Sequence, residues 1–485
     1  MKKNLGVNAV LNLSKTALSI IFPLITYPYV SRVLGVENIG KVNYTASFVS
    51  YFALIAALGL STYAIREGGK VRGDQEKLEK LGSQLFTLNI LSTLISYILL
   101  FIFVFFFVKN PDYQKLILLQ STTILFTTLG IDWVNVIFED FLYVTVRSLV
   151  VQLLSLILIF LVVKTAHDYY IYAAISVITS GIICVLNLLY CRRYMKLRLV
   201  WDLDIKKHMS PILILFSGGL AISIYANSSV LILERLQGVY YVGLYSLATR
   251  VYTILKTLLA SIYSVAIPNL SHLYGARRFS EFKNVYTNIL SYITLLLIPL
   301  SAGLIVVSSE IIAFMGGRDY ADATLTLQLL ALSLIGAIFG GAFTYALNIP
   351  IGKEKVNFIG SIYAIFINIA LTVLLVPLFK QNGAAISIIA SEFFIFFYSF
   401  FTVKESRQFI DMSLWIKNIM HSVLGFILII LFGYFVKYFV TNVFLYFPII
   451  VAGSVVLYVV ELVLFKNSTF LHTVDLLKTR FLKKG

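Results

Sequence analysis

Charged residues are scarce in this chain of 485 residues. Asp, Glu, Lys and Arg together make up 13% of the sequence, whereas apolar residues make up 59%. A soluble domain carries about twice that charged fraction, most of it on the surface. The shortage of charge therefore excludes an ordinary soluble protein and indicates a chain that lies in a membrane.

Cysteine, histidine and nucleotide-binding motifs are also scarce. The two cysteines are too few for a disulfide framework, and we expect both thiols to be reduced. The five histidines show no metal-ligand spacing, so we expect no metal site. No P-loop glycine-lysine motif occurs, which excludes direct coupling to ATP. With no loop long enough for a catalytic domain, the sequence predicts a transporter or channel and not an enzyme.

Long apolar runs recur along the whole chain, and each is long enough to cross roughly 30 Å of hydrocarbon as a helix. The runs are continuous and do not alternate with polar residues, which excludes a strand barrel. We therefore predict an all-α polytopic membrane protein with about fourteen transmembrane helices. The predicted spans are 5–33, 42–65, 83–108, 115–137, 142–163, 169–190, 209–233, 242–267, 285–307, 323–347, 356–379, 383–402, 414–437 and 443–465.

Lysine and arginine are concentrated in alternate connections between these spans. If the N-terminus is placed inside, the inner connections hold most of the 39 basic residues, above all 66–80, 191–207 and 476–484. The positive-inside rule then predicts that both termini are cytoplasmic. The same bias accounts for the net charge of +16, so we expect membrane lipids, and no nucleic acid, to be the partners of these charges.

A short pattern occurs at the ends of two predicted spans. Residues 31–40 (SRVLGVENIG) and 234–243 (ERLQGVYYVG) share an arginine and two glycines at a constant offset of 203 positions. Six spans separate the copies, and because six is even both copies have the same orientation. This predicts a parallel repeat of two pseudo-symmetric six-helix lobes with a substrate cavity between them. The predicted N-terminal lobe is 1–200, the C-terminal lobe is 201–405, and 406–485 holds two further helices and a basic tail.

Polar residues form a line along the first span and another along the eighth span, at 100° per residue. Hydroxyl and amide side chains on such lines either surround a hydrated cavity or join helices by hydrogen bonds, and both interpretations stay open. The first line comprises Asn8, Asn12, Lys15, Ser19 and Thr26, and the second comprises Arg250, Thr253, Thr257, Ser261 and Ser264, with Lys256 and Thr249 beside it.

Three cations lie within these spans, namely Lys15, Arg250 and Lys256. Spans one, two, seven and eight hold no acidic residue in their middle that could pair with them. Because an unpaired charge in lipid costs a few kcal/mol, such side chains usually face a bundle interior or water. We therefore expect the three cations to line the cavity and to bind an anionic substrate, with Asn12 and Thr253 beside them.

Two arginines at span ends are further candidates for substrate binding. Arg32 could contact the substrate, extend to the headgroups or pair with Glu37. Arg147 has the same alternatives, with Glu139 or Asp140 as the possible partner.

Two acidic residues lie within other spans. Asp132 in the fourth span and Glu392 in the twelfth could each bind a coupling Na⁺ or H⁺. Pairing with an arginine is the alternative for both. Beyond such an ion, we expect no cofactor.

A basic cavity between two mobile lobes points to a large anionic amphiphile. A lipid-linked diphosphate fits this description, with the diphosphate at the cations, the glycan in the cavity and the lipid tail in the bilayer. Transport would proceed by alternating access, in which the two lobes expose the cavity to each side in turn.

Three segments resemble those of a known family. The stretch from Asn12 to Glu67, "GIDWVNVIFEDFLYVTVRS" at 130–148, and "GLYSLATRVYTILKTLLASIYSVAIPNLSHLYG" at 243–275 are similar to polysaccharide-biosynthesis flippases of the Wzx type. These belong to the multidrug/oligosaccharidyl-lipid/polysaccharide exporter superfamily. The resemblance implies twelve to fourteen helices in two lobes, and basic cavity residues that carry over to Lys15, Arg250 and Lys256. The second span has no cation in its middle, unlike the family pattern.

The function implied by the resemblance is a flippase of the bacterial plasma membrane. It would move oligosaccharide repeat units linked to undecaprenyl diphosphate from the inner to the outer leaflet, for capsule or another surface polysaccharide. A polysaccharide polymerase or export machinery is the implied protein partner. Two alternatives stay open, namely a flippase for the peptidoglycan lipid precursor and a cation-coupled drug exporter of the same superfamily.

Overall fold

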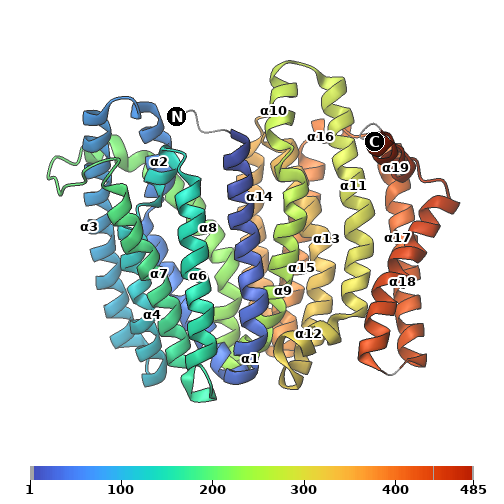
Figure 1. The fold of residues 1–485 in the computed structure, drawn as a ribbon, viewed down its shortest axis with the longest axis horizontal. Coiled ribbons are helices and arrows are strands. Elements are labelled where there is room, and N and C mark those ends of the chain that lie inside the picture. Colours follow the sequence, from blue (N-terminus) through green and yellow to red (C-terminus); the bar gives the residue numbers. More distant parts are fainter. Residues whose placement is uncertain (1–4, 441, 483–485) are drawn as a thin grey trace. The chain divides into compact units, whose positions relative to one another are not determined.

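The computed structural model describes residues 5–440 and 442–482, and it describes side chains for all of these except 5–19, 406, 443–444 and 476–482. Every regular element in those ranges is helical (Figure 1). The helices are α1 (Leu5–Ala57), α2 (Leu60–Val71), α3 (Gln75–Phe107), α4 (Pro111–Leu129), α5 (Asp132–Ile137), α6 (Phe141–Val162), η1 (Ala166–Asp168), α7 (Tyr169–Cys191), α8 (Ile205–Gln237), α9 (Val239–Ser264), α10 (Ile267–Gly275), α11 (Phe279–Val306), α12 (Ser308–Gly316), η2 (Arg318–Ala323), α13 (Thr324–Gly341), η3 (Ala342–Asn348), α14 (Glu354–Phe379), α15 (Gln381–Thr402), α16 (Glu405–Gln408), α17 (Met412–Phe439), α18 (Val443–Leu464) and α19 (Ser468–Leu482).

The helices confirm an all-α membrane protein. Within the described chain, 13 helical segments are long and apolar enough to cross a membrane. The helix α1 has 53 residues, a length of about 80 Å at 1.5 Å per residue, which far exceeds one crossing of roughly 30 Å. It breaks at Gly35, whose φ of 75° and ψ of 171° are not helical. The two halves of α1 therefore correspond to the first two predicted spans, and the remaining spans bring the total to the predicted fourteen.

The contacts between helices divide the chain into two compact units. Unit 1 comprises Met1–Gly243 and Met315–Asp319, and unit 2 comprises Leu244–Phe314 and Tyr320–Gly485. The lobe boundaries predicted at residues 200 and 405 rest on the sequence repeat and not on contacts between helices. These lobe boundaries stay a prediction. Unit 1 extends beyond residue 200 because it includes the helix α8. The repeat assigns α8 to the second lobe, whereas its contacts are with α1 and α2 in unit 1.

Unit 1 has two apolar clusters. One lies around Trp133 and joins α2, α3 and α5 to Ile212 near the start of α8. The other lies around Phe48 and joins α1, α3 and α4, and Leu231 near the end of α8 packs against it. Both ends of α8 are thus fixed to unit 1 by burial of apolar side chains.

Unit 2 is built on close packing of α11, α13, α14, α15 and α17. Gly336 of α13 faces α15 so closely that a Cβ there would lie 2.8 Å from the backbone nitrogen of Phe393. Gly433 of α17 packs in the same way on Val306 of α11. Because lipid provides no hydrophobic drive between helices, small residues at such contacts allow the close approach that stabilises them.

The repeated pattern has the same backbone conformation in both copies. Gly35 has φ 75° and ψ 171°, and Gly238 at the equivalent position has φ 90° and ψ 172°. A positive φ with an extended ψ is accessible almost only to glycine. Each copy ends one helix segment and begins the next, which explains why the sequence places glycine at both positions.

The two copies also pack against each other, through their second glycines. A Cβ on Gly40 would lie 1.9 Å from the carbonyl oxygen of Val239, and a Cβ on Gly243 would lie 2.1 Å from that of Val36. Val36 and Val239 are themselves equivalent by the repeat, so the contact has approximate two-fold symmetry. Backbone touches backbone at this point, and no other residue type fits.

We predict that Gly40→Ala and Gly243→Ala each destabilise the chain by about 1–3 kcal/mol, because the added methyl overlaps a carbonyl oxygen. Gly218→Ala in α8 is the matched control, since a Cβ there meets nothing within 4 Å. This control should be neutral or stabilise by up to about 1 kcal/mol through helix propensity. Thermal unfolding of the three purified variants in one detergent measures the difference, and equal unfolding temperatures would contradict the close contact.

Candidate substrate and coupling sites

The polar line of the eighth span lies on the accessible side of α9. Arg250, Thr253, Thr257, Ser261 and Ser264 are all exposed. Leu255 lies on the opposite side of the helix, where it lines an apolar cavity of unit 2. One face of α9 therefore presents a guanidinium and four hydroxyls, and the other is apolar.

Three hydroxyls of this face form hydrogen bonds within α9 and not with another helix. Thr257, Ser261 and Ser264 donate to carbonyls of α9 itself, at 2.8, 2.6 and 3.1 Å. By contrast, Asn368 and Thr372 of α14 are buried. The arrangement on α9 favours a hydrated surface over helix-joining hydrogen bonds.

Lys256 lies at the flank of this face and forms an ion pair. Its Nζ is 2.5 Å from Oε1 of Glu392 on α15. The hydroxyl of Tyr252, one turn earlier on α9, lies 3.2 Å from the same oxygen, and the ammonium is 5.5 Å from the centre of the tyrosine ring. The Lys256 side chain is 35% exposed and that of Glu392 is 5% exposed, so the lysine connects the accessible surface to a buried carboxylate.

The expectation that Lys256 has no acidic partner is therefore wrong. No acidic residue lies in the middle of spans one, two, seven or eight, and the partner Glu392 belongs to the twelfth predicted span instead. The contact of Gly336 with the α15 backbone beside Glu392 holds that carboxylate in the interior of unit 2. The roles of Lys256 in substrate binding and of Glu392 in ion coupling stay predictions, but the structure brings the two residues together.

Arg147 and Asp132 form the corresponding pair in unit 1. Nη2 of Arg147 lies 3.1 Å from Oδ1 of Asp132, with side-chain exposures of 3% and 55%. The guanidinium also lies 5.4 Å from the ring centre of Tyr143. Its Nε and Nη1 are buried with no hydrogen-bond partner among the described residues. Asp132 thus holds a buried cation, and its own carboxylate stays accessible.

The two partners considered from the sequence for Arg147 are engaged elsewhere. Glu139 binds Arg72 at 2.9 Å, and Asp140 accepts hydrogen bonds from the hydroxyls of Tyr190 and Tyr194. Arg147 on α6 pairs instead with Asp132, which is the first residue of the short helix α5. The alternative of pairing with an arginine is confirmed for Asp132, whereas Glu392 pairs with a lysine.

The exposed carboxylate of Asp132 lies in a cavity of about 350 Å³ within unit 1. Hydroxyl side chains of several helices line the same cavity, including Ser61, Thr123, Thr127 and Ser180. Oxygen atoms of this kind are the ligands that hard cations such as Na⁺ prefer. The described residues contain no group of three His, Cys, Asp or Glu side chains that could hold a metal ion.

Arg32 is exposed at the end of the first half of α1. Its side chain lies beside Gly317, in the segment Met315–Asp319 that belongs to unit 1. The preceding Ser31 donates to the carbonyl of Met315 at 2.5 Å. Arg32 thus lies next to a structural contact at the repeated turn, and a substrate role stays a prediction. Lys15 and Asn12 lie on α1, but their side chains are outside the described residues.

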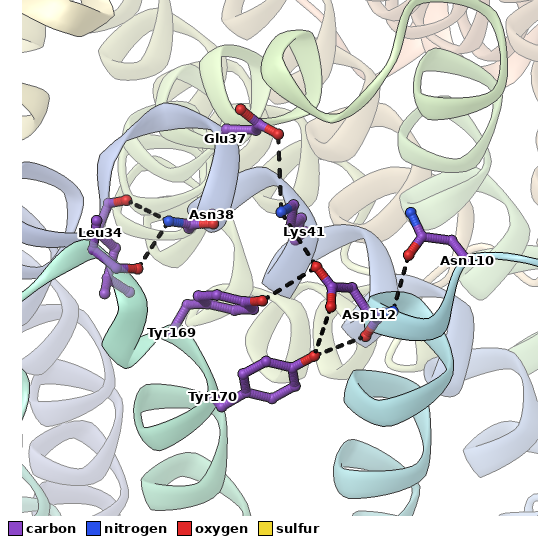
Figure 2. Close-up of polar contacts among 9 residues, drawn as sticks. Leu34, Glu37, Asn38, Lys41, Asn110, Asp112, Tyr169 and Tyr170 are labelled. Carbon is purple, nitrogen blue, oxygen red and sulfur yellow. Dashed lines mark hydrogen bonds and ion pairs between the residues drawn. The ribbon is translucent and has the colours of Figure 1, made fainter.

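A polar cluster surrounds the same turn in unit 1 (Figure 2). Asp112 at the start of α4 lies 3.7 Å from Nζ of Lys41 and accepts hydrogen bonds from the hydroxyls of Tyr169 and Tyr170 at 3.4 and 3.3 Å. Asn38 donates to a carbonyl in the α6–α7 connection at 2.9 Å. The cluster ties the turn of α1 to the ends of α4 and α7.

Sequence reasoning overlooked two groups in these regions. Tyr252 lies four residues before Lys256, a spacing that places both on one helix face, and this spacing could have identified it. Glu234 accepts hydrogen bonds from Tyr44 and Tyr113. No sequence signal links Glu234 on α8 to Tyr44 on α1 and Tyr113 on α4.

Comparison with protein families decides the affiliation of the chain. The model of the family described as "Polysaccharide biosynthesis protein" matches residues 5–274, which is more than half of the sequence. The chain belongs to this family. A second model, that of the MatE family, matches residues 215–374. The resemblance noted from the sequence is thereby confirmed.

A curated relative and two solved structures agree with this affiliation. The capsular polysaccharide biosynthesis protein CapF of Staphylococcus aureus is 25% identical over 74% of this chain and 88% of its own length. The fold is similar to that of the lipid II flippase MurJ in an inward closed conformation, with a TM-score of 0.76 and 17% identity over 94% of this chain and 98% of the other.

The second structure is an inward-facing multidrug resistance MATE family transporter of the MOP superfamily. It has a TM-score of 0.58 and 15% identity over 82% of this chain and 99% of the other. The prediction of an all-α, two-lobed membrane protein is confirmed at the level of fold, and both of these solved structures are of transport proteins, a flippase and a multidrug transporter.

The unequal burial within the two ion pairs predicts unequal effects of removing each partner. Lys256→Met should destabilise the chain by roughly 3–5 kcal/mol, because it leaves the buried Glu392 carboxylate without a counter-charge. Glu392→Gln should cost less, and the double variant should recover most of the loss.

In the other pair the buried partner is the arginine, so Asp132→Asn should cost more than Glu392→Gln. Thermal unfolding in one detergent measures all four, and additive effects of the two Lys256–Glu392 substitutions would contradict the pairing.

Proposed function

We propose that the chain moves oligosaccharide repeat units linked to undecaprenyl diphosphate from the inner to the outer leaflet of the bacterial plasma membrane. The glycan would then be assembled into capsule or another surface polysaccharide by a separate polymerase and export machinery. Both termini lie in the cytoplasm in this proposal. The family membership and the relative from Staphylococcus aureus support a substrate from polysaccharide biosynthesis.

The observation that carries the proposal is the two-sided character of α9. Its exposed face offers the Arg250 guanidinium and hydroxyls to an anionic, hydrated group. Its opposite face contributes Leu255 to an apolar cavity of about 460 Å³, lined mostly by aliphatic side chains of α11, α17 and α18. A molecule with a diphosphate, sugars and a long hydrocarbon chain also has a polar part and an apolar part. The hydrophobic effect favours contact of its hydrocarbon chain with such an apolar surface.

Charge favours this substrate over a cationic drug. The exposed face of α9 carries a guanidinium and no carboxylate, and Lys256 at its flank is partly exposed while its acidic partner is buried. A cationic drug would be repelled by this surface, whereas a diphosphate would form charge-assisted hydrogen bonds with it. Lys15 of α1 is proposed as a further diphosphate contact, with Asn12, Thr253, Arg32 and Arg147 in supporting roles.

The Lys256–Glu392 pair offers a means of coupling transport to an ion. In the resting state Glu392 holds the ammonium. A diphosphate that binds Lys256 would compete with this carboxylate, and Na⁺ or H⁺ bound to Glu392 would neutralise the charge left behind. Substrate and coupling ion would then favour each other, because each relieves the cost of an unpaired buried charge. Asp132, with its accessible carboxylate, is the alternative coupling site.

The first test of the function is genetic and chemical. We predict that deletion of the gene causes undecaprenyl-linked repeat units of a surface polysaccharide to accumulate, as measured by mass spectrometry of extracted lipids. Restoring the wild-type chain should remove the accumulation. An excess of the peptidoglycan lipid precursor instead would identify the alternative flippase activity and overturn the proposed substrate.

The second test concerns the cations. Lys15→Ala, Arg250→Ala and Lys256→Ala should each lower transport of the lipid-linked glycan by at least roughly tenfold, because a hydrogen bond to a charged group contributes about 1.5–3 kcal/mol. Lys355→Ala, which removes an exposed lysine in the first turn of α14, is the control. Export unchanged in all three variants, at normal protein levels, would refute the anion-binding site.

The third test concerns coupling. In proteoliposomes with an imposed Na⁺ or pH gradient, wild-type transport should increase with the gradient that drives it. Glu392→Gln should transport at a rate independent of either gradient, because the amide takes up no proton and has no negative charge for Na⁺ to neutralise. If Asp132→Asn loses the gradient dependence and Glu392→Gln keeps it, the coupling site is in unit 1.

A further inference from the structure

The connection between α7 and α8, residues 192–204, runs as an extended segment along α3; we call it the strap (green, beside the upper end of α3 in Figure 1). Three acceptors one helical turn apart on α3 bind its backbone. Glu79, Ser83 and Thr87 accept hydrogen bonds from the backbone N–H groups of residues 196, 198 and 200, each at 3.1 Å. The strap is therefore held in a fixed register by side chains of a helix.

Further contacts fix both ends of the strap. Gly82 of α3 lies under Met195 and Leu197, so close that a Cβ would approach their side chains to 2.9 and 3.0 Å. Near the other end, Gln84 donates to the carbonyl of Asp202 at 2.8 Å, and the Asp202 carboxylate lies 3.5 Å from Nζ of Lys80. Both ends of the strap are therefore attached to α3, and its first apolar side chain, Met195, is buried.

Two large apolar side chains of the strap nevertheless point away from the protein. Leu199 is 68% exposed and Trp201 is 93% exposed. They follow exposed Lys196 and Arg198 along the extended backbone. Residues 192–207 together hold six basic and two acidic residues. A tryptophan in water on a well-ordered segment, beside a concentration of cations, is unfavourable unless another surface covers it.

The surface of α3 locates the strap relative to the bilayer. Exposed residues of α3 before the strap are polar, such as Lys77 and Lys80, whereas from Leu91 onward the exposed residues are apolar. The strap bonds to α3 between these two zones. Its last contact, Thr87, is about 6 Å along the helix axis from Leu91. The strap thus lies at the level where the helix enters hydrocarbon, which is where tryptophan is enriched in membrane proteins.

An apolar hollow lies on the hydrocarbon side of this level. Its volume is about 190 Å³, and it is lined by side chains of α3 and α8 and of the α1–α2 connection, including Leu91, Ile95, Ile205 and Met209. Ile205 begins α8 directly after the strap and is 53% exposed. An acyl chain in this hollow would have its headgroup at the strap, beside Lys196, Arg198 and the lysines at 206 and 207.

We propose that the strap and this hollow form a binding site for an anionic phospholipid. The acyl chain occupies the hollow, Trp201 inserts at the headgroup level, and the basic side chains bind the phosphate and the acidic headgroup. Six cations against two anions select an anionic over a zwitterionic lipid by charge complementarity. The site anchors the connection between α7 and α8 to the membrane, and it is separate from the polar face of α9.

Tryptophan fluorescence tests this site directly. The other two tryptophans, Trp133 and Trp415, are buried at 7% and 4% exposure, so Trp201 is the tryptophan that lipid can reach. The full chain is reconstituted in lipid vesicles that contain phosphatidylglycerol or phosphatidylcholine brominated either near the headgroup or near the chain end. We expect the strongest quenching from phosphatidylglycerol brominated near the headgroup, and we expect Trp201→Phe to abolish that quenching.

Paired charge variants test the selectivity. Lys196→Gln with Arg198→Gln should lower the preference for phosphatidylglycerol by roughly fivefold for each charge removed. Arg277→Gln with Lys355→Gln removes two exposed cations of unit 2 and should leave the preference unchanged. Monodisperse protein and unchanged emission from the buried tryptophans establish that each variant is folded.

Three results would overturn the proposal. Equal quenching by the two lipids would refute a site for anionic lipid. Quenching that persists unchanged in Trp201→Phe would show that the tryptophan reached by lipid is not Trp201, which removes the evidence for the site. An equal loss of preference in the unit 2 control would show that net charge, and not the strap, attracts the lipid.

Discussion

Backbone contact between the two copies of the repeated turn is the constraint on which unit 1 depends. Gly40 and Gly243 bring α1 and the start of α9 together with no side chain between them, and Gly35 and Gly238 give both turns the same conformation. Since α8 ends at this contact, the helix is held in unit 1 even though the repeat relates it to α1. The polar cluster around Lys41 and Asp112 surrounds the same turn, so several helix ends are ordered by one close approach.

Two ion pairs within the spans share a second feature, which is that a buried charge meets a counter-charge from another helix. Lys256 meets Glu392, and Arg147 meets Asp132. In each pair one member is buried and the other is more accessible, and the accessible member is a cation in unit 2 and a carboxylate in unit 1. A buried ion pair contributes little to stability by itself, because desolvation offsets the attraction. Its accessible member can exchange partners, which is the property that a transport cycle requires.

The strap shows how a membrane protein can order a connection without regular secondary structure. Acceptors at one-turn intervals on α3 replace the partner strand that an extended backbone would otherwise need. The apolar and basic side chains that remain exposed then lie at the boundary between hydrocarbon and water. The function proposed for α9 and the lipid site proposed for the strap thus rest on the same physical division of a surface into polar and apolar parts.

The sequence by itself determined the class of the protein, the number of spans and the repeat, because these depend on local composition and on glycine positions such as 35 and 238. It also identified the polar face of α9, since helical periodicity fixes which residues share a side. Only the tertiary structure decided the partners of Lys256 and Arg147, because Glu392 lies more than a hundred residues from its lysine and Asp132 reaches its arginine through the turn between α5 and α6. The assignment of α8 to unit 1 and the course of the strap likewise depend on packing between distant segments, which no local pattern in the sequence records.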